Sequence, residues 1–175
     1  MGGEEVDALW SNMSINLIEG GRRQTMEQAA QGFAPMMKHM FSALGAMSRA
    51  FYEKSGDEAL PIIAEGARKS GVGQAEIMQK MMPVRSMKDI GEMLKMMGGM
   101  MGLQMEMVEL SDDTLHFKGP QCLLGIEGTS KGLCEAMMNS DKSMMSTLLG
   151  REVEMNVLKS VAAGDKECEV IFSSK

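Results

Sequence analysis

The C-terminal stretch from Glu152 to Phe172 decides the fold, and it reads EVEMNVLKSVAAGDKECEVIF. Two runs within it, Glu152 to Val161 and Cys168 to Phe172, have the alternating apolar pattern of β-strands. Between them, Ala163-Gly-Asp-Lys166 has the Gly-Asp chemistry of a hairpin turn. The stretch therefore predicts two antiparallel strands that close the chain.

A second hairpin and a helix are predicted just upstream. Apolar and polar residues alternate from Leu103 to Val108 and again from Thr114 to Lys118, and Ser111-Asp-Asp113 supplies a turn between the two runs. Apolar residues recur at helical spacing from Ser130 to Leu149. We therefore expect an antiparallel sheet of about four strands, packed on helices, over residues 101–175.

The first 100 residues have a mainly helical pattern. From Met37 to Phe51 apolar residues recur at steps of three and four, which predicts a helix over about 30–53 with this stripe buried. Three further helical segments are predicted: Ser55 to Gly71, starting with a Ser-x-x-Glu capping box, Gly73 to Met82, and Ser86 to Met97, capped by Ser86-x-x-Asp89. The whole pattern is that of an α+β fold in one domain over 1–175.

Composition and charge exclude several classes of function. The chain has 175 residues, with 24 acidic against 18 basic side chains and a net charge of -6, which removes the attraction that non-specific nucleic-acid binding requires. No apolar run approaches the ~20 residues that span a bilayer, and the start from Met1 to Glu5 is acidic, unlike a signal peptide. We expect a cytoplasmic protein without nucleic-acid or membrane partners.

Methionine is the unusual component, because 23 residues are methionine while only 4% are aromatic. Thioether clusters can hold Cu(I), since soft sulfur suits a soft ion. Methionine also fills irregular cores and lines adaptable ligand pockets or dimer surfaces. The sequence leaves these three alternatives open, with core or pocket favoured over copper.

Three cysteines, Cys122, Cys134 and Cys168, fall on three different predicted elements. None has CxxC spacing, and the phase of the last strand places Cys168 on its apolar face. Cys134 lies near the start of a helix, where the helix dipole favours a thiolate. The three are either buried small hydrophobic residues or a site that converges on a metal or substrate. His39 and His116 have ordinary structural explanations, and hydrolase, kinase and zincin motifs are absent.

The segment from Ser160 to Phe172, with Gly164-Asp-x-x-Cys168-Glu169, resembles the closing signature of the 4-vinyl reductase type domains and of the L-2-amino-thiazoline-4-carboxylic acid hydrolase-like family. The match extends more loosely to Cys122, after Gly119-Pro120, and to Cys134. The resemblance implies an α+β domain, usually dimeric, that encloses a small-molecule pocket between helices and sheet. Zinc-binding members resemble one another in using a Glu and three cysteines. Cys168 matches the last of these, but the preceding one falls on Ser160.

Two functions are therefore expected from different classes. The first is a sensory domain that binds a small molecule or a metal, with a Met-rich apolar pocket and a metal site of Cys122, Cys134 and Cys168 for zinc or an iron-sulfur cluster. The second, implied by the resemblance, is a ring-opening hydrolase with Cys134 or Cys122 as nucleophile and Glu127 or Glu135 handling protons. A homodimer is expected in either case, and a structural subunit using a methionine surface is a third possibility.

Overall fold

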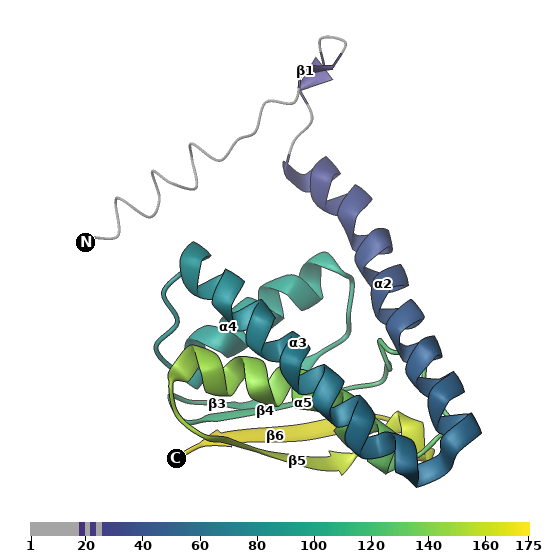
Figure 1. Cartoon of the computed structure of the whole chain (residues 1–175). Coiled ribbons are helices and arrows are strands. Elements are labelled where there is room, and N and C mark those ends of the chain that lie inside the picture. Colours follow the sequence, from purple (N-terminus) through teal and green to yellow (C-terminus); the bar gives the residue numbers. More distant parts are fainter. Residues whose placement is uncertain (1–17, 20–21, 24–25) are drawn as a thin grey trace.

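A four-stranded antiparallel sheet with helices on one face forms the body of the molecule (Figure 1). The computed structural model describes residues 18–19, 22–23 and 26–175. The strand order is β3-β4-β6-β5, so the last strand of the chain lies inside the sheet. The elements are β1 (Ile18–Glu19), β2 (Arg22–Arg23), α2 (Met26–Ser55), η1 (Gly56–Ala59), α3 (Leu60–Met81), α4 (Met87–Met100), β3 (Glu106–Leu110), β4 (Thr114–Gly119), α5 (Lys131–Leu149), β5 (Val153–Lys159), η2 (Val161–Ala163) and β6 (Cys168–Ser174).

The core lies between the sheet and the helices, as the strand alternation predicts. Leu115 of β4 pairs with Phe172 of β6, and Val157 of β5 pairs with Val170 of β6, and all four are buried. Their neighbours in sequence face the opposite side of the sheet, which carries ion pairs such as Lys118 with Glu106. The α+β prediction, with a helical first half and a C-terminal sheet, is confirmed.

Helix α3 corrects the predicted break near Gly71. It runs without interruption from Leu60 to Met81 and packs against α5. A Cβ at Gly71 would lie 2.1 Å from the backbone oxygen of Ser140, so the glycine marks a close helix crossing and not a helix end. The predicted capping box at Ser55 is also wrong, because Ser55 makes no side-chain cap hydrogen bond.

The predicted cap of α4 is confirmed. Ser86 accepts a hydrogen bond from the Asp89 backbone N–H at 3.3 Å, and the Asp89 carboxylate accepts one from the Ser86 backbone N–H at 3.1 Å. Pro83 lies in the extended segment that separates α3 from α4, again as predicted.

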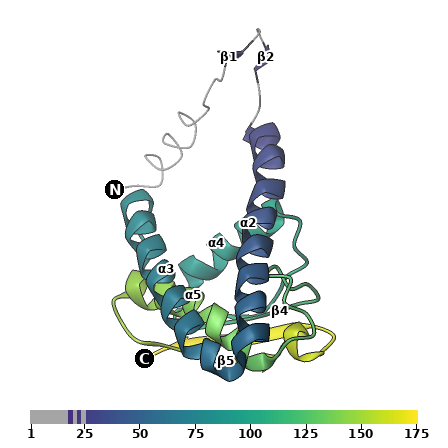
Figure 2. The ribbon, with the colours of Figure 1, turned by 45° about the vertical axis from the view of Figure 1, so that its right-hand side comes forward.

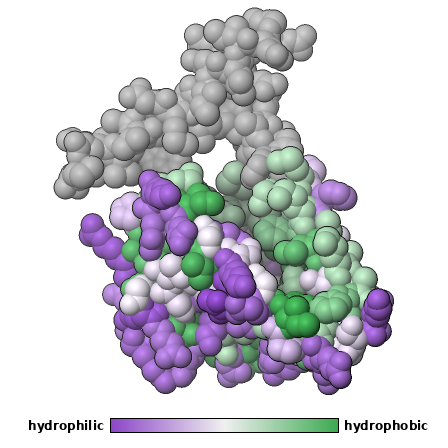
Figure 3. All heavy atoms as spheres, in the orientation of Figure 1, coloured by the Kyte–Doolittle hydropathy of each residue, from purple (hydrophilic) through white to green (hydrophobic). Residues whose placement is uncertain are grey.

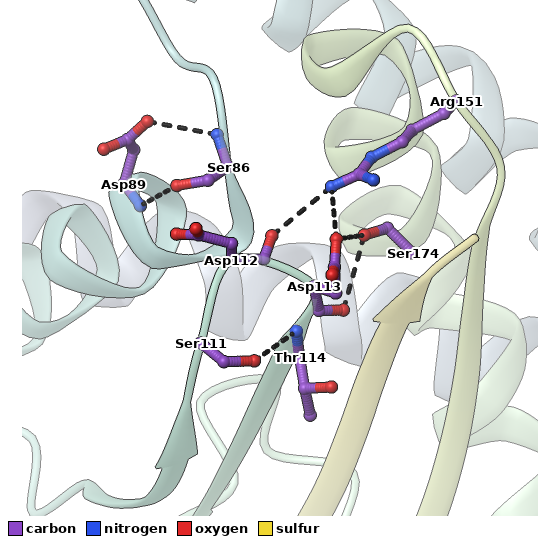
Figure 4. Close-up of polar contacts among 8 residues, drawn as sticks. All are labelled: Ser86, Asp89, Ser111, Asp112, Asp113, Thr114, Arg151 and Ser174. Carbon is purple, nitrogen blue, oxygen red and sulfur yellow. Dashed lines mark hydrogen bonds and ion pairs between the residues drawn. The ribbon is translucent and has the colours of Figure 1, made fainter.

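The predicted turn Ser111-Asp-Asp113 joins α4, the sheet and the C-terminus (Figure 4). The backbone oxygen of Asp112 accepts from the Met87 N–H at 2.9 Å, and the Asp113 oxygen accepts from the Ser174 N–H at 2.9 Å. Arg151, just after α5, donates to the Asp113 carboxylate at 2.8 Å. One three-residue turn therefore fixes the relative positions of α4, β6 and the α5–β5 connection.

Helix α2 lies largely apart from the rest of the body. Figure 2 shows α2 and α3 diverging from η1, with the N-terminal half of α2 extending beyond the other helices. The predicted helix over 30–53 is confirmed, but its apolar stripe is not buried: Met47 is 72% exposed and Leu44 is 50% exposed. The spacing correctly predicted which residues share a face of the helix. The prediction that this face lies against the core is wrong.

Within the described residues, no helix combines the length and apolarity that crossing a membrane requires. The predicted absence of a signal peptide rests on Met1 to Glu5, which lie outside the described residues. The cytoplasmic location, the absence of nucleic-acid binding and the single-domain extent of 1–175 stay predictions.

Candidate functional site: three thiols around a buried hydroxyl

The three cysteines come from a loop, a helix and a strand, as predicted. Cys168 is the first residue of β6, where it pairs with Gly119 at the end of β4. Cys122 lies three residues beyond that glycine, in the loop that leads to α5. Cys134 is buried in the first turns of α5, and its thiol lies 3.9 Å from the sulfur of Met138. All three are free thiols.

The pKa values of two thiols show that the cysteines share one neighbourhood. Burial raises the pKa of Cys134 to about 11, opposed by the adjacent Ser160 hydroxyl and reinforced by repulsion from Cys168 and Cys122. Burial also raises the pKa of Cys168, a hydrogen bond from the Val161 backbone opposes the shift, and the nearby Cys122 and Glu127 reinforce it. Both thiols therefore carry their protons at neutral pH.

The raised pKa of Cys134 corrects the prediction that the helix dipole makes it a thiolate. Ser130 caps α5 by accepting from the Leu133 N–H at 3.1 Å, so the N-terminal dipole is present. The surroundings of Cys134 are apolar, however, and the desolvation of a thiolate there outweighs the dipole. A nucleophilic cysteine requires a lowered pKa, so the geometry does not favour Cys134 as a nucleophile.

Ser160 is the polar centre of this neighbourhood. Its side chain is fully buried, and among the described residues its hydroxyl oxygen has no hydrogen-bond partner. The backbone around it is well satisfied, since its N–H donates to the Asp165 carboxylate at 2.8 Å and its carbonyl accepts from Ala163 and Asp165. The turn after β5 thus holds Ser160 in place without using its hydroxyl. Buried hydroxyls nearly always have a partner, so this one marks a place where a ligand group would be favourable.

The loop that carries Cys122 is held against α2. A Cβ at Gly45 would lie 1.7 Å from the backbone oxygen of Leu124, so α2 touches the loop backbone at a glycine. Arg49 also donates to the backbone oxygen of Glu127 at 3.2 Å. The loop turns at Gly125 and Gly128, which have φ values of 64° and 71°. The position of α2 and the path of the Cys122 loop therefore depend on each other.

The predicted metal site is not assembled in the described part of the chain, where no three His, Cys, Asp or Glu side chains converge closely enough to hold an ion. A metal site of Cys122, Cys134 and Cys168 stays a prediction.

Methionine fills the core instead of lining an open pocket. Five methionines are buried between α4, α5 and the sheet: Met87, Met93, Met137, Met144 and Met145. A cleft of about 320 Å³ opens at the end of β3 and β4, but the ion pair between Lys118 and Glu106 lies in its wall and Met105 is its one methionine. This cleft does not match the Met-rich apolar pocket that the sequence predicts.

Asp141 is a polar residue that the sequence reasoning missed. Its side chain is half-buried on the core-facing stripe of α5, four residues after Met137 and three before Met144, and no cationic side chain pairs with it in the described residues. Burial raises its pKa from 3.8 to about 6. The signal was available, because a charged residue interrupts an otherwise apolar spacing. The two histidines are ordinary: His39 is exposed, and His116 pairs with Glu169 at 3.0 Å.

Comparison with known proteins supports the fold and leaves the family open. No family model matches the sequence, and no curated protein is significantly similar to it. Among solved structures, the phenol-responsive sensory domain of the transcription activator PoxR, bound to phenol, aligns with a TM-score of 0.56 and 18% identity over 77% of this chain and 74% of that one. A trafficking protein particle complex subunit 3 from Naegleria fowleri, covalently bound to palmitic acid, aligns with a TM-score of 0.59 and 14% identity over 79% and 94%. These likenesses show that the chain shares its overall fold with both proteins, and membership of the family that the sequence resembles stays a prediction.

Proposed function

We propose that this protein is a sensory domain that binds a small, mainly apolar molecule with one polar group, and that the polar group pairs with the Ser160 hydroxyl. The observation that carries the proposal is this hydroxyl, fully buried and unpartnered beside the Cys134 thiol. A ligand hydroxyl or carboxyl there would satisfy a group that the described residues leave unpaired.

The methionine-rich core supports the apolar half of the proposal. Methionine has a flexible, unbranched side chain, so a core that contains Met137, Met144 and Met145 can repack around a guest more easily than a branched core. The fold neighbours are consistent with this, since one was solved with phenol and the other with palmitic acid. Phenol and palmitate are therefore the first probes.

The test compares Ser160→Ala with the parent protein and with a control variant, Ser143→Ala. Ser143 is a partly buried serine on α5, so the control also removes one serine hydroxyl. In the absence of ligand, Ser160→Ala should leave the free energy of unfolding unchanged or raise it by about 1 kcal/mol, because it removes an unpaired buried hydroxyl. We expect phenol or palmitate to raise the melting temperature of the parent and of Ser143→Ala. Ser160→Ala should bind the ligand at least tenfold more weakly, so its melting temperature should rise much less at the same ligand concentration. Equal ligand shifts in all three proteins would contradict the proposed role of Ser160.

A metal is the second candidate, favoured by the shared neighbourhood of the three thiols. Zinc suits cysteine ligands, and the raised pKa values mean that Cys134 and Cys168 must each release a proton to bind it, so affinity should increase with pH. Metal binding would also require the three thiols to converge more closely than they do in the described structure. Elemental analysis of protein purified without oxygen should find zinc, or iron for an iron-sulfur cluster, and Cys168→Ser should abolish it. Metal-free protein that does not bind added zinc would eliminate this candidate.

A cysteine hydrolase stays a prediction that no feature of the site favours. Cys134, the most deeply buried of the three thiols, has a raised pKa, and of the two carboxylates named for proton transfer only Glu135 has a charged partner among the described residues. Glu135 pairs with Lys131 at 3.6 Å, and Glu127 uses its backbone oxygen to bind Arg49.

A further inference from the structure

Helix α2 presents an apolar band to solvent. Its large members are Met36, Met40, Leu44, Met47 and Phe51, which are between 37% and 72% exposed, and the exposed Ala43 lies among them. Figure 3 shows hydrophobic residues gathered along this helix, on the right of the molecule. An exposed apolar patch of roughly 500 Å² is about as large as a typical monomeric protein carries, and such patches are often functional surfaces.

The opposite face of α2 fixes the direction in which the band points. Gly45 is buried against Leu124, and Arg49 is bonded to Glu127, so this side of the helix lies on the body of its own chain. Residues a half-turn away on the helix must then face outward. The band is therefore a fixed outer surface of the molecule and does not arise from a loosely attached helix.

The composition of the band favours an apolar partner. From Met40 to Ser48 the helix carries no charged residue, so covering it requires no desolvation of ions. The small Ala43 at the centre of the band would let a second helix approach closely. An amphipathic helix is the element that fits a straight apolar band of this length.

The positions of the band residues are symmetric about a point between Ala43 and Leu44. A second α2 running in the opposite direction and centred there places Met36 opposite Phe51, Met40 opposite Met47, and Ala43 opposite Leu44. Every member of the band then has a partner in the band of the other copy, which is the self-complementarity that a twofold interface requires. A parallel pair would instead place each residue opposite itself and leave the two chain bodies on the same side.

We propose that two copies of this chain associate through their α2 helices, packed antiparallel along this band. Covering the band on both copies removes about 1,000 Å² of surface, which is at the lower limit for a specific interface. The proposal stands independently of the ligand site, because none of the band residues belongs to the thiol neighbourhood.

The first experiment measures the oligomeric state of the full chain by sedimentation equilibrium. The variant Leu44→Glu adds a charge at the centre of the band, and because the interface is twofold it does so twice. We expect the parent to be dimeric at micromolar concentration and Leu44→Glu to dissociate at least about 100-fold more easily. Ile77→Glu is the control, since Ile77 is an exposed apolar residue on α3, outside the band, and this variant should remain dimeric.

A cysteine-pair experiment tests the direction of packing. Mixing chains that carry Met40→Cys with chains that carry Met47→Cys should give a disulfide-linked heterodimer under mild oxidation, while Met40→Cys alone should not link to itself. The three native cysteines are buried or partly buried, and the parent chain measures their background.

Three results would overturn the proposal: a parent chain that is monomeric, a dimer that Leu44→Glu does not weaken, or efficient linkage of Met40→Cys to itself. A monomer would include the case in which another part of this chain covers the band. Circular dichroism of each variant separates loss of association from loss of fold.

Discussion

At the scale of single residues, one buried and one half-buried polar group carry most of the functional information. Ser160 has a hydroxyl without a partner, and Asp141 has a carboxyl on an apolar helix stripe without a cation. Evolution of a core tends to remove such groups, because each lowers stability without a compensating contact. Their presence beside a repackable methionine core is what distinguishes this interior from an ordinary one.

Asp141 should make stability depend on pH in a recognisable way. Its folded-state pKa of about 6 is above its ordinary 3.8, so the folded state holds the proton more tightly than the unfolded state. The resulting stabilisation is complete below pH 4 and is lost as the pH rises through 6. Asp141→Asn should remove this dependence and raise the free energy of unfolding at pH 8 by about 2 kcal/mol. Urea unfolding at several pH values measures it, and an unchanged pH slope in the variant would show that Asp141 is solvated.

At the scale of elements, the α3–α5 contact is the part of the helical layer whose substitution should change stability most. Gly71→Ala would place a methyl group against the backbone of Ser140, and backbone cannot move aside as a side chain can. We expect a loss of about 3 kcal/mol or more. Gly73→Ala, two residues along the same helix, meets nothing within 4 Å and should stabilise the protein by about 0.5–1 kcal/mol. Similar effects of the two substitutions in denaturant unfolding would mean that the close crossing is absent in solution.

Much of the element layout could be predicted because its signals are local. The period-two alternation of β5 and β6, the Ser86 and Asp89 cap and the turn at Ser111 each depend on residues close together in sequence. The continuity of α3 could not be predicted, because glycine ends helices and also permits close crossings, and the partner backbone at Ser140 is 69 residues away. Strand phase correctly placed Cys168 beside the core. The position of Cys122 depends on Leu124 meeting Gly45, a long-range contact that no spacing encodes.

At the scale of the whole molecule, α2 links the apolar band to the thiol neighbourhood. The same helix presents Leu44 and Met47 outward and holds the Cys122 loop through Gly45. Any change that moves the loop should therefore be felt by α2.

Gly45→Ala tests this connection. The new methyl group would lie 1.7 Å from the Leu124 oxygen, so the helix and the loop must separate. We expect Cys122 to react several-fold faster with a thiol reagent, because its loop loses its cover, while buried Cys134 changes little. Gly66→Ala is the control, since a Cβ there meets nothing within 4 Å. Mass spectrometry of the alkylated peptides gives the rate for each cysteine, and equal Cys122 rates in the two variants would show that α2 does not hold the loop.

The methionines of the chain should differ in how easily they are oxidised, because those of the α2 band are exposed and others are buried. Peroxide converts an accessible thioether to a polar sulfoxide, which would turn the most exposed members, Met47 and Met40, from apolar contacts into hydrated ones. Met87 and Met145 are fully buried and should be oxidised only when the protein unfolds. Brief peroxide treatment followed by peptide mass spectrometry should find sulfoxide on exposed residues such as Met47 of α2 and Met81 of α3 before the buried Met87 and Met145, and methionine sulfoxide reductase should reverse it. Association of two copies along the band would shield Met47 from peroxide but not the equally exposed Met81 of α3, so the ratio of sulfoxide at these two positions would report how much of the protein is paired.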